Sequence, residues 1–90
     1  MRLYILEEDL FEAGLPVEEA EYDAKVEDNI AIVFGRIDDG SFRIKVVKVN
    51  GKFFIEVPED IVRKVHLNND EHYLPAYYHS KEGVIAFHIS

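Results

Sequence analysis

The sequence contains no cysteine and no tryptophan, one methionine and three prolines in 90 residues. Without cysteine the chain forms neither a disulfide framework nor a thiolate metal site. The absence of cysteine is compatible with a reducing cytosol. It also lacks any apolar run of the roughly 18 residues that a membrane span needs, and acidic residues begin at Glu7. We therefore expect a cytoplasmic protein that does not enter a membrane.

Motifs that carry catalysis are missing as well. No nucleophile elbow, phosphate-binding loop or dinucleotide fingerprint occurs, and the four histidines have no short ligand spacing such as His-x-x-x-His. Adjacent carboxylates at Asp38 and Asp39 lack the regular oxygen spacing of a calcium loop. These patterns predict a protein that is not an enzyme and that uses no catalytic residue, metal or cofactor.

The chain does contain enough apolar material for one small domain over residues 1–90. Hydrophobic residues make up 48% of it, and six Phe and five Tyr supply bulky core side chains.

Charge is distributed unevenly along the chain. Residues 1–34 hold ten acidic residues against Arg2 and Lys25, which equals the whole net charge of −8, whereas residues 43–64 hold six basic residues against three acidic ones.

The strongest local signal is a hairpin. Runs rich in β-branched and aromatic residues at 43–49 and 52–57 flank Asn50-Gly51, a pair that favours a type I′ turn. Pro58 then sets the backbone for a first helical turn. Two further strands are expected over 73–79 and 83–89, with Ser80 to Gly83 as their turn.

This pattern occurs twice. The order strand, short helix, strand, strand is predicted for a first unit over about 1–34 and for a second over about 43–90, with a turn-rich connector at 35–42. The helices are expected near 8–13 and 59–66, and Gly14 is expected at the position just after the first. Neither unit buries its sheet alone, so we predict one interlocked, barrel-like core with a helix at each end or flank.

The second unit resembles the SpoVT/AbrB family of swapped-hairpin domains. The resemblance rests on a strand, a tight turn, a Pro-x-Asp-hydrophobic-Arg helix start and a short helix ending in Leu, carried by Ile55, Val57, Pro58, Asp60, Ile61, Arg63, Val65 and Leu67. It implies a mainly β fold with short helices, of the swapped-hairpin or cradle-loop barrel type. Two units in one chain imply a fused pseudo-dimer, or a homodimer of such chains.

Family members act as DNA-binding transcription regulators or as the DNA-binding part of antitoxins, so the resemblance implies binding to double-stranded DNA. Basic residues of the second unit are the candidates for phosphate contacts: Arg43, Lys45, Lys48, Lys52, Arg63 and Lys64. The net charge of −8 opposes this function, because affinity for nucleic acid comes from replacing counterions with Lys and Arg.

The alternative is an acidic protein-interaction module, or adaptor, that does not bind DNA. Its candidate residues are carboxylates of the first unit that would dock a basic partner protein: Glu7, Glu8, Asp9, Glu12, Glu18, Glu19 and Glu21. The simplest interpretation of both charge clusters is that they form an ordinary solvent-exposed surface with no binding function. The sequence leaves the choice open.

Overall fold

Seven strands and two short helices are present in the residues that the structure describes, so the expected mainly β class is confirmed. The computed structural model describes residues 1–28, 31–65 and 77–88. In chain order the elements are β1 (Arg2–Ile5), α1 (Glu7–Glu12), β2 (Ala20–Glu27), β3 (Ala31–Gly35), β4 (Phe42–Val49), β5 (Lys52–Glu56), α2 (Glu59–Lys64), β6 (Tyr77–Lys81) and β7 (Val84–His88).

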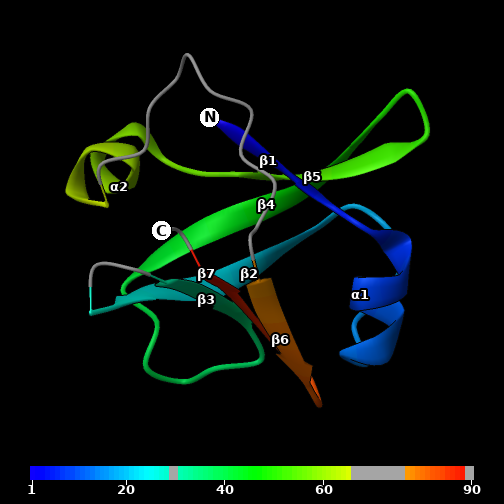
Figure 1. Cartoon of the computed structure of the whole chain (residues 1–90), viewed down its shortest axis with the longest axis horizontal. Helices are drawn as coiled ribbons and strands as arrows, with labels where there is room; N and C mark the ends of the chain where they lie inside the picture. The colour runs from blue at the N-terminus through cyan, green and yellow to red at the C-terminus, as the bar shows by residue number, and fades with distance from the viewer. Residues whose placement is uncertain (29–30, 66–76, 89–90) are drawn as a thin grey trace.

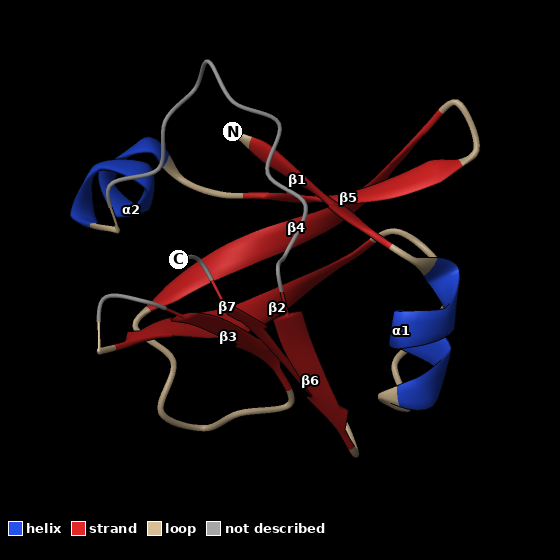
Figure 2. Ribbon diagram, in the orientation of Figure 1, coloured by secondary structure: helices blue, strands red, loops and turns tan. Residues whose placement is uncertain are grey.

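The strands form one curled sheet in the order β1-β5-β4-β2-β3-β7-β6, and every neighbouring pair is antiparallel (Figure 2). Strands from the two halves of the chain interleave in it. β1 pairs with β5, β2 with β4, and β3 with β7, so each of these contacts joins a strand of residues 1–35 to one of residues 42–88. The two halves therefore share one sheet and one core.

Alternation along the strands places the core on the concave side of the sheet. Leu3 and Ile5 of β1 are buried, as are Ile44 and Val46 of β4, while the residues between them are more exposed. β3 is buried along its whole length. The continuous cluster of buried apolar side chains is the main source of stability, because burial of apolar area is the dominant favourable term in folding.

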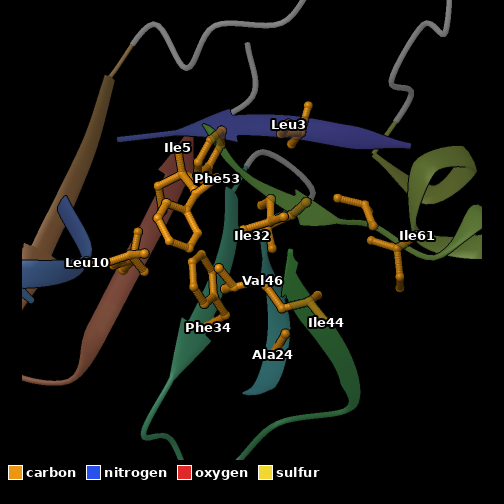
Figure 3. Packing of buried hydrophobic residues seen from close by; sticks show 14 of the residues in the cluster. Leu3, Ile5, Leu10, Ala24, Ile32, Phe34, Ile44, Val46, Phe53 and Ile61 are labelled. Atoms are coloured by element: carbon orange, nitrogen blue, oxygen red, sulfur yellow. The ribbon is translucent and has the colours of Figure 1, made fainter. Parts of the chain in front are cut away.

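The two helices lie at opposite ends of the sheet (Figure 1). Leu10 of α1 reaches the core near Ile5 and Phe53, whereas Ile61 of α2 reaches it at the other end (Figure 3). The end of α1 is fastened by a backbone hydrogen bond from the Leu15 amide to the Leu10 carbonyl, 2.9 Å long, and Gly14 has the positive φ of 76° expected after a helix. The expected helix positions are thus confirmed to within two residues.

The predicted hairpin at Asn50-Gly51 is also confirmed, with φ of 51° and 79° at the two turn residues. The turn expected over Ser80 to Gly83 was too long. Ser80 and Lys81 belong to β6, because Lys81 is in register with Val84 and only Glu82 and Gly83 are left to turn the chain. The predicted strand residues 73–76 and the motif residue Leu67 lie outside the described residues.

Candidate partner-binding surface

The most exposed large apolar side chain of the described residues belongs to α1. Phe11 has 76% of its surface exposed, and Val17, in the segment that follows the helix, has 41%. Both line a shallow open hollow of about 350 Å³ whose other lining residues are Glu7, Glu8 and Glu12. We call these five residues the α1 surface.

The helical period explains why Phe11 points outward. Leu10 and Ala13 lie three positions apart on the face of α1 that packs against the core, and both are fully buried. Phe11 is one residue further on than Leu10, which rotates it about 100° away from that face. The sequence therefore places an aromatic ring among carboxylates on the solvent side of the helix.

Six of the seven candidate acidic residues, all but Asp9, fall into three sets. Glu7, Glu8 and Glu12 surround the exposed ring and form no ion pair with the side chains that the structure describes. Glu18 is exposed in the loop before β2. Two others have partners inside the chain: the Glu19 carboxylate accepts a hydrogen bond from the Lys48 backbone amide at 3.1 Å, and Glu21 lies 4.0 Å from the Arg43 guanidinium.

Asp9 is the half-buried member of the acidic set. One of its carboxylate oxygens, Oδ2, is buried and accepts no hydrogen bond from a described residue. Burial raises the pKa of Asp9 above its ordinary value of 3.8, and the negative charges of Glu12 and Glu8 raise it further, while the hydrogen bond with the Leu6 backbone acts in the opposite direction. The ionised form of Asp9 is therefore disfavoured in the folded state.

We predict that Asp9→Asn changes the free energy of unfolding more favourably at neutral pH than in acid. A raised pKa means that the folded state holds the Asp9 proton more tightly than the unfolded state, so wild-type stability falls as the pH rises from below 3.8 through the folded pKa. Asparagine removes this loss. The check is the difference in unfolding free energy between variant and wild type, measured at about pH 3 and about pH 7. A difference that is equal at both pH values, or more favourable in acid, would show that Asp9 carries no such cost.

Two of the candidate DNA-binding residues of β4, Arg43 and Lys45, face carboxylates of neighbouring strands. The Arg43 guanidinium lies 3.0 Å from the Asp23 carboxylate and 4.0 Å from that of Glu21. Lys45 stands directly across from Glu21 on β2 and from Glu56 on β5. Cross-strand pairs of opposite charge stabilise the sheet modestly and reduce the field available to a phosphate backbone.

The remaining basic candidates lie apart from Arg43 and Lys45. The Lys48 ammonium sits 5.4 Å from the centre of the Phe53 ring, and the Lys52 ammonium 5.9 Å from that of Tyr4. Strand alternation puts Lys48 on the opposite face of β4 from Arg43 and Lys45. Arg63 and Lys64 are exposed in the last turn of α2. The structure therefore does not gather the six residues into one basic face.

Sequence reasoning identified the carboxylates of the α1 surface but missed Phe11 and Val17. A single apolar residue beside other apolar residues is usually taken as core. The signal that could have found Phe11 is its offset from Leu10 and Ala13 on a helical period, with glutamates on either side.

Comparison of the chain with protein-family models, with curated protein sequences and with solved structures finds no match. The resemblance to the SpoVT/AbrB family therefore stays a prediction that rests on the motif of the second unit. Among the described residues, no group of three His, Asp or Glu side chains could hold a metal ion, and no helix is long and apolar enough to cross a membrane.

Proposed function

We propose that this protein is an interaction module that binds a basic partner protein through the α1 surface. The observation that carries the proposal is the exposed ring of Phe11 at the centre of Glu7, Glu8 and Glu12. An aromatic anchor with a charged rim is the arrangement in which a few residues provide most of the binding energy.

Each part of the α1 surface has a physical role in this function. The carboxylates attract a positively charged partner over long range and so increase the rate of encounter. The Phe11 ring offers apolar area to the methylene groups of an arginine or lysine and an aromatic face to its charged end. A partner segment that combines basic and apolar residues fits both features.

A DNA-binding regulator of the SpoVT/AbrB type, or an antitoxin, is the rival function. Arg63 and Lys64 favour it, because both are exposed and lie on one short helix. The pairing of Arg43 with Asp23 and the net charge of −8 oppose it. The six basic candidates remain the predicted phosphate contacts of that rival.

The topology also supports the proposal that the chain is a fused pseudo-dimer of two swapped-hairpin units. In such a pseudo-dimer, equivalent strands of the two units meet across an approximate two-fold axis and run antiparallel. β1 and β5 are equivalent in the predicted repeat, as are β3 and β7, and both pairs are antiparallel neighbours in the sheet.

The test is capture of partners from a host lysate on the immobilised chain, with and without nuclease. We compare wild type with the variant Glu12→Lys, Glu18→Lys, Glu19→Lys. The matched control carries the same change of charge away from α1, at Asp28, Asp38 and Asp60, all exposed. We expect wild type and control to retain the same basic protein after nuclease treatment, and the first variant to lose it.

Two outcomes would overturn the proposal. Capture that disappears with nuclease would assign the association to nucleic acid, and a labelled DNA duplex retarded at low salt, with a steep salt dependence, would support the rival function. Equal capture by all three proteins would mean that the acidic residues of the α1 region are only a solvated surface.

A further inference from the structure

The exposed tip of the β4–β5 hairpin carries chemistry that the proposed function does not use. We infer that Asn50 is a site of spontaneous deamidation in the folded protein, with the Gly51 amide nitrogen as the nucleophile and a cyclic succinimide as the intermediate. The chain has four asparagines, and Asn50 is the only one that is followed by glycine. This modification does not depend on the α1 surface or on any partner.

The reaction joins groups of two adjacent residues. The Gly51 nitrogen forms a bond to Cγ of the Asn50 side chain and loses its proton to solvent, and the side-chain nitrogen leaves as ammonia. Water then opens the five-membered imide at one of its two carbonyl carbons. The products are aspartate, which keeps the original backbone, and isoaspartate, in which the backbone runs through the side chain and is one methylene group longer.

The hairpin tip leaves both reacting groups accessible. Asn50 and Gly51 are exposed, and a Cβ atom added to Gly51 would meet nothing within 4 Å. The Gly51 amide donates no hydrogen bond to a described residue. In a two-residue hairpin turn the flanking residues, here Val49 and Lys52, form the closing pair of the ladder. The nucleophile is therefore outside the ladder and is not shielded by a side chain.

The turn itself slows the reaction without preventing it. Asn50 and Gly51 are held at φ of 51° and 79°, and bond formation requires a rotation that brings Asn50 Cγ to the Gly51 nitrogen. Only the tip has to open for this rotation, because Phe53 and Phe54 of β5 are also paired with β1. We therefore expect deamidation to be slower in the folded chain than in the unfolded chain, but still measurable.

Isoaspartate at position 50 would change the hairpin and its surroundings. Its extra methylene group lengthens the link between Val49 and Lys52, and a type I′ turn has room for only two residues of normal length. Gly51 and Lys52 also line a hollow of about 250 Å³ together with Glu7 and Glu8 at the start of α1. A distorted tip therefore alters the environment of these two glutamates as well.

The test follows the mass of peptides from the full-length chain during incubation in mildly alkaline buffer, with and without urea. Isoaspartate is told apart from aspartate by its selective enzymatic methylation. Two variants serve as controls. Gly51→Ala places a side chain beside the nucleophile, and Asn50→Gln would have to close a six-membered ring. We expect each to lower the rate of deamidation at position 50 at least about tenfold.

In wild type we expect Asn50 to become a mixture of aspartate and isoaspartate, faster in urea than without it, while Asn29, which precedes Ile30, stays unmodified. The isoaspartate form should show changed amide shifts at residues 47–54 and at Glu7 and Glu8. A folded wild type that stays intact at Asn50 while the chain in urea reacts would overturn the inference, because the hairpin would then block the reaction. Equal rates in wild type and both variants would overturn it too, since Gly51 would not be the nucleophile.

Discussion

Replacing Gly35 by alanine is expected to lower the free energy of unfolding by about 3 kcal/mol, a large share of the stability of a small domain. Gly35 ends β3 with φ of 130°, a backbone conformation that L-residues rarely adopt. A Cβ atom there would lie 2.1 Å from the Gly83 carbonyl oxygen and 3.1 Å from the Val84 Cα. These atoms belong to the backbone of the β6–β7 hairpin. The Gly83 carbonyl also accepts a hydrogen bond from the Arg36 amide at 2.7 Å, so neither the end of β3 nor this hairpin can move away easily.

Gly51→Ala is the matched control for this prediction. Gly51 also has a positive φ, 79°, but a Cβ added to it meets nothing within 4 Å. Its substitution therefore carries backbone strain of about 1 kcal/mol without a clash. Urea unfolding of the two variants and wild type measures both effects. A Gly35→Ala variant no less stable than Gly51→Ala would contradict the close approach of β3 to the β6–β7 turn.

Phe11→Ala is expected to weaken partner binding by roughly 30-fold, equivalent to about 2 kcal/mol, while leaving stability within about 0.5 kcal/mol of wild type. The ring is 76% exposed and so contributes little to the core, and alanine is the better helix former. Loss of the ring removes the apolar centre of the α1 surface and leaves its carboxylates in place.

The neighbouring residue provides the control. Leu10 is fully buried in the core, so Leu10→Ala should lower the unfolding free energy by about 3 kcal/mol. Titration calorimetry with the captured partner and urea unfolding of both variants give the two quantities. Unchanged affinity in Phe11→Ala would show that the partner does not contact α1, and a large loss of stability in that variant would show that the ring belongs to the core.

The elements that the sequence predicted well are those encoded by adjacent residues. Asn50-Gly51 determines a type I′ turn by its tolerance of positive φ, and Pro58 followed by Glu59 and Asp60 starts α2 where expected. Gly14 ends α1 for the same kind of local reason. Each of these features depends on backbone preferences within four or five residues.

Apart from the exposure of Phe11, which a helical period could have shown, the features that sequence reasoning missed depend on pairing between distant segments. Whether Arg43 is free to meet a phosphate depends on its register with Asp23, which lies on another strand 20 positions away in the sequence. The pairing of β1 with β5, which leaves β1 at the end of the sheet, is equally non-local. Composition alone could show the excess of basic residues between positions 43 and 64, but it could not show that carboxylates of β2 lie beside Arg43.

The most direct test of the α1 surface is chemical-shift mapping of the whole chain, labelled with ¹⁵N and titrated with the captured partner. We predict that the largest amide shift changes fall between residues 7 and 19, centred on Phe11, and that residues 43–52 and 63–64 change little. Largest changes at Arg43, Lys45, Arg63 and Lys64, with residues 7–19 unaffected, would contradict binding at the α1 surface and assign the partner to the basic candidates instead.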